Sequence, residues 1–188
     1  MPCAATARVG DNVGVGLPPF ELHGEQVRLR STTPADAVVL HTILCTPGVA
    51  QWWPNVTREE VEELAARGDV EAFVIEFDGD VIGVIQYSEE REPDYEHASI
   101  DIAIHDDWQG RGLGTDAVRT LARHLIHDRG IHRVTIDPAA ANERAIRCYE
   151  KVGFRAVGIM RDYERGGDGT WHDGLLMDLL AADLTGAG

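Results

Sequence analysis

The 188-residue sequence contains few cysteines, few basic residues and no long hydrophobic run. Its three cysteines, Cys3, Cys45 and Cys148, are widely spaced and form no Cys-x-x-Cys pair, so we expect neither a disulfide framework nor a metal site. No segment approaches the length of a membrane span, and the N-terminus lacks a basic segment followed by an apolar stretch. We therefore expect no membrane association and a cytoplasmic location.

Basic residues are outnumbered, with 17 Lys and Arg against 32 Asp and Glu, which gives a formal net charge of −15. An acidic surface repels phosphate backbones and attracts cations, so nucleic acid is not an expected partner. A polyamine, an aminoglycoside or a basic peptide fits this charge, and acidity for solubility alone is the alternative. The length suits one domain with a sizeable core.

Hydrophobic periodicity and turn residues predict a mixed α+β domain with one central sheet. Residues 1–24 have no regular period and are expected to form an N-terminal arm, followed by the domain at residues 25–182 and a tail at residues 183–188. Phe20 and Leu22 of the arm are expected to dock on the domain or on a second subunit. Strands are expected at residues 27–30, 71–77, 81–87, 98–104, 132–137, 154–160 and 175–180, and helices at residues 33–45, 57–68, 114–128 and 142–152. A loop is expected at residues 161–171.

A glycine-rich turn joins the strand at residues 98–104 to the following helix. Glycine lets the backbone approach a ligand closely, and a helix N-terminus offers unpaired N–H groups and a positive dipole end. The turn therefore indicates a phosphate or pyrophosphate site, and a plain tight connection is the alternative. It lacks the Lys-Ser/Thr of a P-loop and the third glycine of a dinucleotide-binding fingerprint. Its sequence is Gln109-Gly110-Arg111-Gly112-Leu113-Gly114.

This turn, with the pattern Gln-x-x-Gly-x-Gly, resembles the acetyl-CoA pyrophosphate loop of the GCN5-related N-acetyltransferases. A second motif of that family, Asn-x-x-Ala-x-x-x-Tyr-x-x-x-Gly-Phe, matches residues 142–154 at every defined position. The resemblance covers residues 25–182 and implies the GNAT fold, a mixed central sheet of six to seven strands with flanking helices, and acetyl-CoA as cofactor. It implies cofactor contacts from Ile102, Ile104, Gln109, Gly110, Arg111, Gly112, Leu113, Gly114, Thr115 and Asn142.

The same resemblance implies a catalytic pair. Tyr149, two helical turns after Asn142, matches the family's tyrosine that protonates the departing thiolate, a step suited to a weak acid. Transfer needs a neutral amine, so a base must accept its proton. Asp101 is the first candidate because it lies on the strand face opposite Ile100, Ile102 and Ile104. Weaker candidates are Glu76, Glu89, His97 and His105.

The acceptor class is indicated by a closer resemblance. The segment Thr135-Ile136-Asp137-Pro138, the helix motif and the pair Trp52-Trp53 resemble aminoglycoside 6′-N-acetyltransferases, which confer antibiotic resistance. This implies a small cationic amine as substrate, bound by Trp52, Trp53, Glu76, Glu89 and Asp137.

Other functions stay open. Residues 27–30 and 34–36 resemble acetyltransferases of protein N-terminal amines, and another small amine or a non-catalytic acyl-CoA-binding module is also compatible. A homodimer is possible through an exposed final strand.

Overall fold

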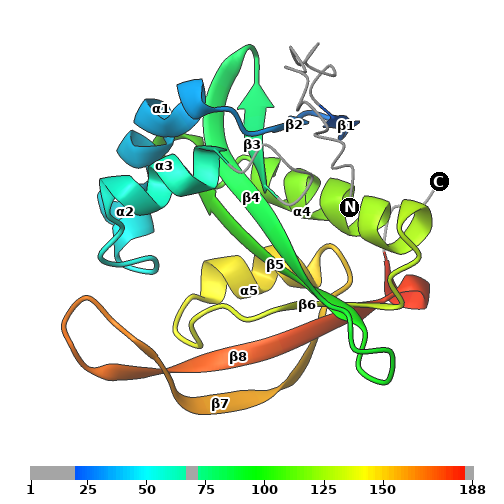
Figure 1. Cartoon of the computed structure of the whole chain (residues 1–188). Helices are drawn as coiled ribbons and strands as arrows, with labels where there is room; N and C mark the ends of the chain where they lie inside the picture. Colours follow the sequence, from blue (N-terminus) through cyan, green and yellow to red (C-terminus); the bar gives the residue numbers. More distant parts are fainter. Residues whose placement is uncertain (1–19, 67–71, 185–188) are drawn as a thin grey trace, which may run out of the picture.

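The computed structural model describes residues 20–66 and 72–184, and a twisted mixed sheet with helices on both faces runs through them (Figure 1). The strand order is β1-β2-β3-β4-β5-β6-β8-β7, and every neighbouring pair is antiparallel except β5 and β6. The strands are β1 (Glu21–His23), β2 (Arg28–Ser31), β3 (Ala72–Phe77), β4 (Asp80–Glu90), β5 (His97–Ile104), β6 (Arg133–Ile136), β7 (Arg155–Arg165) and β8 (Trp171–Leu180).

Helices cover the two faces of the sheet because the strands alternate. On β3, Phe73 and Ile75 pack in the same core cluster as Leu121, while Val74 packs in a second cluster with Leu40 and Val61. The first cluster lies beneath α4 and α5 and the second beneath α1 and α3. The helices are α1 (Ala37–Leu44), α2 (Pro47–Ala50), α3 (Arg58–Ala66), α4 (Leu113–Arg123), which continues as a π-helical turn (His124–Asp128), and α5 (Glu143–Glu150).

The expected α+β class with one mixed central sheet is confirmed, but the expected number of strands is too low, because the sheet of the described residues has eight strands instead of six to seven. Residues 21–23, expected in the arm, form β1 and pair with β2. Phe20 stacks near Phe73 and His124, with ring centroids 6.2 and 5.2 Å away, so this residue docks on the domain.

The prediction of a loop at residues 161–171 is also wrong for most of these residues. β7 runs to Arg165 and β8 starts at Trp171, with Glu164 paired to His172, so only residues 166–170 form the turn. β7 is an edge strand exposed along nearly its whole length, and Val157 and Ile159 are 53% and 56% exposed. The homodimer stays a prediction, for which this strand is the candidate surface.

Several expectations lie outside the described residues: most of the N-terminal arm, the end of the helix at residues 57–68, the first residue of the strand at 71–77, Cys3 and the last four residues of the tail. None of the described helices is long and apolar enough to cross a membrane. Within the same residues, no group of three or more His, Cys, Asp or Glu side chains is arranged to hold a metal ion.

Candidate active site

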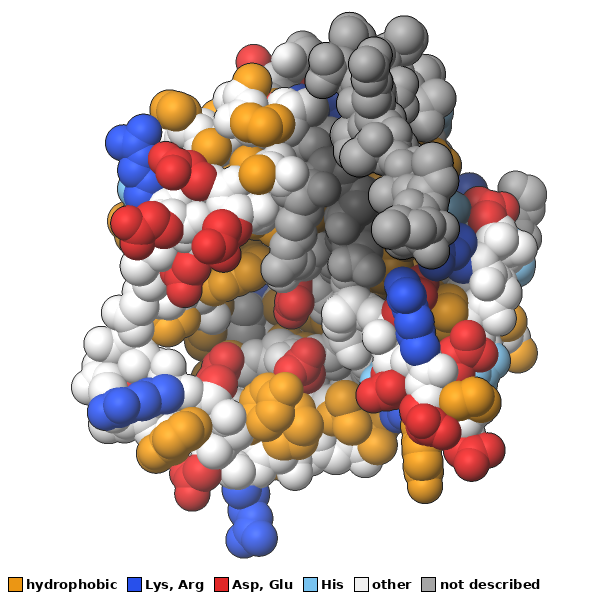
Figure 2. Space-filling model, in the orientation of Figure 1, with side chains coloured by type: hydrophobic (Ala, Val, Ile, Leu, Met, Phe, Trp, Pro, Cys, Tyr) orange, Lys and Arg blue, Asp and Glu red, His pale blue; other side chains and the backbone are white. Residues whose placement is uncertain are grey.

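A break in the pairing of β5 creates the site. β5 and β6 pair in parallel only at Ala98 with Val134 and Ser99 with Thr135, and from Ile100 onward the two strands diverge. The edge of β5 from Ile100 to Ile104 therefore faces a cavity of about 510 Å³ instead of a strand. Figure 2 shows this part of the molecule as a hollow with acidic side chains around it. The backbone of Ile102 lies in this wall, where it is available to form hydrogen bonds with a bound ligand.

Glycines shape one half of the cavity, where β5 leads into α4. Gly110 and Gly112 have φ of +78° and +86°, a left-handed conformation that glycine adopts without steric cost. A Cβ on Gly114 would lie 3.3 Å from Ile104 Cδ1, so a side chain there would crowd the wall. The first turn of α4 adds N–H groups without intrahelical acceptors. These features suit the approach of a phosphate-bearing ligand.

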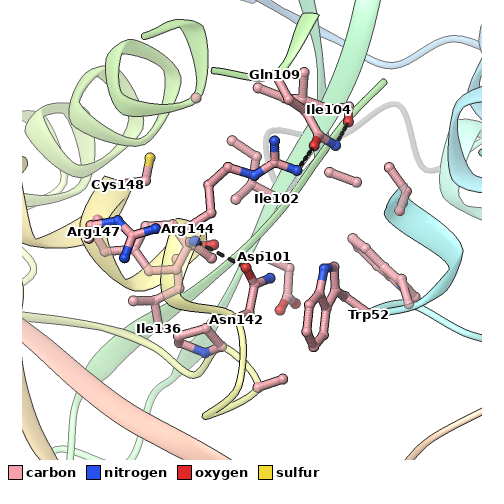
Figure 3. A pocket seen from close by; sticks show the side chains of 18 of the residues that line it. Trp52, Asp101, Ile102, Ile104, Gln109, Ile136, Asn142, Arg144, Arg147 and Cys148 are labelled. Carbon is pink, nitrogen blue, oxygen red and sulfur yellow. Dashed lines mark hydrogen bonds between the residues drawn. The ribbon is translucent and has the colours of Figure 1, made fainter. Parts of the chain in front are cut away.

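Gln109 and α5 close the other side of this half (Figure 3). The Gln109 amide Nε2 donates to the Ile104 carbonyl at 2.7 Å, and its Oε1 accepts a hydrogen bond from the Arg144 guanidinium. Asn142 caps α5, its Oδ1 accepting from the Ala145 N–H at 3.1 Å. The cavity thus receives polar groups from the turn and from α5 together.

Three cations, two in α5 and one at its C-cap, line the cavity and were not identified from the sequence: Arg144, Arg147 and Lys151. In a chain with a net charge of −15 they provide a local positive patch beside the glycine turn. Their spacing after Asn142 on one helix is the sequence pattern that could have predicted them. They are compatible with an anionic cofactor.

Two candidate catalytic groups, Asp101 and Tyr149, line the same cavity. Tyr149 is buried, and burial, together with the nearby Cys148, Asp101 and Asp137, raises the pKa of its hydroxyl above the usual range, so that it stays protonated. The Asp101 carboxylate faces the cavity and is open to it, while protein surrounds its other sides; this desolvation, followed by the charge of Asp137, raises its pKa, and a hydrogen bond from Gln86 Nε2 at 3.3 Å opposes the shift.

Cys148 also lines the cavity, and its sulfur lies 3.2 Å from the Thr115 hydroxyl. Burial raises the pKa of the thiol, which keeps it protonated and weakly nucleophilic.

The remaining half of the cavity is acidic and aromatic. Trp52, Trp53 and Asp137 line it as expected, and Glu164 of β7 joins them. The turn of the β7–β8 hairpin reaches this half: a Cβ on Gly167 would lie 3.3 Å from Pro54 Cβ. Glu164 was missed because residues 161–171 were assigned to a loop.

The structure does not bring every predicted site residue to the cavity. Glu76 forms ion pairs with Arg28 and Arg30, and Glu89 with Arg91 and Arg129, so their carboxylates are held by cations of the protein outside the cavity lining. His97 and His105 do not line the cavity either. The same holds for Arg111, whose guanidinium lies over the Trp108 ring, and for Leu113, which is buried in the core. The other predicted residues line it: Trp52, Trp53, Asp101, Ile102, Ile104, Gln109, Gly110, Gly112, Gly114, Thr115, Asp137, Asn142 and Tyr149.

Comparisons with known proteins point to one family. Residues 26–155 match the family model described as an acetyltransferase (GNAT) domain. Aminoglycoside N(6′)-acetyltransferase type 1 of Klebsiella pneumoniae is 30% identical over 157 residues, which cover 72% of this chain and 77% of that protein. The ribosomal protein uS5-alanine N-acetyltransferase of Escherichia coli (strain K12) is 30% identical over 106 residues, covering 56% of this chain and 54% of that protein.

Among solved structures, the aminoglycoside acetyltransferase AAC(6′)-Ib in complex with coenzyme A and kanamycin is similar at a TM-score of 0.68 and 28% identity, covering 84% of this chain and 96% of that one.

Proposed function

The chain belongs to the GNAT acetyltransferase family and is an acetyl-CoA-dependent N-acetyltransferase, and from this premise we propose that it acetylates a primary amine of a small cationic acceptor of the aminoglycoside type. The observation that carries the proposal is that one cavity joins a glycine-rich, cationic half to a half lined by Asp101, Asp137 and two tryptophans. The first half suits an anionic cofactor. The second suits an ammonium group on a ring, because carboxylates bind ammonium by charge-assisted hydrogen bonds and indole faces attract cations.

In this mechanism the first half binds the cofactor. The glycine turn, the N-terminus of α4 and the cations Arg144, Arg147 and Lys151 would hold its phosphates, while Asn142 and the edge of β5 would hold its arm. When bound, acetyl-CoA would supply the acetyl thioester for the amine to attack, with the thiol as leaving group.

The side chains then move two protons. Asp101 accepts the proton that the acceptor's ammonium must lose, and its raised pKa makes it a stronger base than an ordinary aspartate. The Ile102 N–H, on the open edge of β5, donates a hydrogen bond to the oxygen on which negative charge develops. The protonated Tyr149 hydroxyl would donate its proton to the departing sulfur. The nitrogen loses a second proton to solvent as it becomes an amide, and Tyr149 is reprotonated from solvent. The product is an amide, and the free thiol of the cofactor is released.

A thiol-release assay with acetyl-CoA tests the proposal against kanamycin, spermidine and a peptide with an N-terminal alanine. We expect kanamycin to have the highest kcat/KM. Preference for the peptide would favour the alternative, acetylation of protein N-termini, to which the similarity with the uS5-alanine enzyme lends support. Cofactor binding without turnover of any amine would indicate an acyl-CoA-binding module and overturn the proposal.

Substitutions test the two catalytic roles. Asp101→Asn and Tyr149→Phe should each lower kcat by about 10²- to 10⁴-fold, the usual contribution of a general acid or base. The matched controls are Asp94→Asn and Tyr95→Phe, in an exposed loop away from the cavity, which should leave kcat unchanged. If Asp101→Asn and Tyr149→Phe also left kcat unchanged, these roles would be wrong.

A further inference from the structure

An irregularity in β7 places an additional carboxylate in the cavity. The register of β7 with β8 shifts first between Ala156 and Gly158 and again after Met160, which pairs with Gly174. Pairing resumes at Glu164 with His172, so at the second shift three residues of β7 lie opposite one residue of β8. Asp162, in the middle of the bulge, has a φ of +50°, which is uncommon for a residue other than glycine. Its N–H donates to the Asp173 carboxylate at 2.9 Å, which holds the bulge in place.

The bulge changes where the next two side chains point. Neighbouring residues of a regular strand project to opposite faces. Here the neighbouring Asp137 carboxylate, as an acceptor and through its charge, raises the pKa of the Tyr163 hydroxyl to about 12, and Glu164 lines the same cavity as Asp137. Gly174 makes room for the tyrosine, since a Cβ there would lie 2.7 Å from Tyr163 Cδ1. Glu164 therefore lines the acceptor half of the cavity, and Tyr163 lies beside the Asp137 carboxylate of that half.

The Glu164 carboxylate has no protein cation bound to it. It is half-buried, and among the described residues it forms no hydrogen bond or ion pair with another side chain. His172, its partner across the strands, has its Nε2 3.1 Å from Asp168 Oδ1 instead. Burial and the charge of Asp137 raise the pKa of Glu164, and His172 opposes the shift. The lysine and arginine side chains that line the cavity come from α5 and its C-cap residue Lys151.

We propose that Glu164, together with Asp137, binds a second ammonium group of the acceptor while the reacting amine lies at Asp101, so that the substrate carries at least two amines. A ligand ammonium would neutralise two neighbouring carboxylates that the protein leaves without a cation. Tyr163, whose hydroxyl interacts with Asp137, is a positioning residue for that carboxylate. This inference rests on the proposed function and narrows its substrate class.

The test compares two acceptors that differ in amine number: kanamycin, and 6-amino-6-deoxyglucose, which carries one amine. Glu164→Gln keeps the shape of the side chain and removes its charge. We expect its KM for kanamycin to rise by about tenfold or more, with kcat within about twofold of the wild type and the KM for the monoamine unchanged. Tyr163→Phe should give a smaller change of the same kind.

Glu96→Gln is the matched control, because it removes one negative charge from an exposed loop outside the cavity and reports any effect of net charge alone. An equal KM for kanamycin in Glu164→Gln and wild type overturns the inference, as does an equal change for both acceptors. Wild-type turnover of the monoamine with a kcat/KM equal to that of kanamycin overturns the inference and leaves the N-acetyltransferase assignment standing. If calorimetry detects no kanamycin binding and no amine is acetylated, the inference and the proposed acceptor fail together.

Discussion

Substitution of Gly174 by alanine should weaken acceptor binding from a position that does not line the cavity. Gly174 is buried on β8, and an added Cβ would lie 2.7 Å from Tyr163 Cδ1 and 3.1 Å from Met160 Cε. Non-bonded carbons are most favourably about 3.5 to 4.0 Å apart. The tyrosine ring would therefore have to retreat by about 1 Å.

The size of the effect follows from this displacement. The Tyr163 hydroxyl interacts with the Asp137 carboxylate, which raises the pKa of the hydroxyl to about 12, and a retreat of the ring by about 1 Å weakens this interaction. A fully formed hydroxyl-to-carboxylate interaction contributes about 1.5 to 3 kcal/mol, and half-exposure of Tyr163 limits the loss to about 1 to 2 kcal/mol. If that energy is lost from acceptor binding, the KM for kanamycin rises about 5- to 30-fold. Overpacking should cost about 1 kcal/mol of folding stability, which lowers Tm by about 2 to 4 °C.

Gly158 provides the matched control because it lies on the same hairpin and a Cβ there would meet nothing within 4 Å. The assay is steady-state thiol release, with kanamycin varied at saturating acetyl-CoA, alongside thermal unfolding of each variant. Gly158→Ala should keep the wild-type KM. A wild-type KM in Gly174→Ala, or the same increase in both variants, would refute the link from Gly174 through Tyr163 to the acceptor.

Two further predictions concern the base and the fold. Asp137→Asn removes a charge that raises the pKa of Asp101, so the pKa of Asp101 should fall. The acidic limb of the kcat/KM profile, where activity is lost as Asp101 becomes protonated, should then move to lower pH. An unmoved limb would contradict the role of Asp101 as base. Asp116→Ala should destabilise the fold by about 2 to 4 kcal/mol in urea unfolding, because the buried carboxylate accepts three N–H groups of residues 25–27 at 2.7 to 3.0 Å. Exposed Asp94→Asn serves as control for both, and a loss below 1 kcal/mol in Asp116→Ala would count against the second.

Most of the fold could be predicted because strong local patterns coincide with the elements. The turn at Asp78 and Gly79 separates β3 and β4 as the hairpin pattern indicates, and α5 begins directly after its cap Asn142. Two features could not be predicted. β1 has three residues, too few to show a period, and it exists because β2 offers an unpaired edge. Next to the hairpin turn, residues 161–165 of β7 and 171–173 of β8 are largely exposed on both faces. No alternation of buried and exposed residues therefore marks them as strands.

The site was predictable only where a motif specifies it. The glycine turn and the helix motif identify residues that line the cavity, because the residues of each motif are close together both in the sequence and in the fold. The acceptor side depends on long-range pairing instead. Glu76 and Glu164 both lie on strands, and Glu76 was the one predicted from the sequence to bind the substrate. Glu76 lies opposite Arg28 in the register and is bound by it, whereas the bulge at Asp162 turns Glu164 into the cavity.

The acidity of the whole chain is therefore a weaker determinant of function than the arrangement of charge within one cavity. A net charge of −15 would repel an anionic cofactor at long range, and the cations of α5 oppose this where the glycine turn lies. On the other half, Asp101, Asp137 and Glu164 have no lining cation beside them. In the proposed reaction the anionic cofactor and the cationic acceptor bind at opposite halves, so the thioester and the amine would meet within the one cavity that Asp101 and Tyr149 both line. The divergence of β5 and β6 after Ser99 creates this meeting point, because it opens the cavity between the two charged halves.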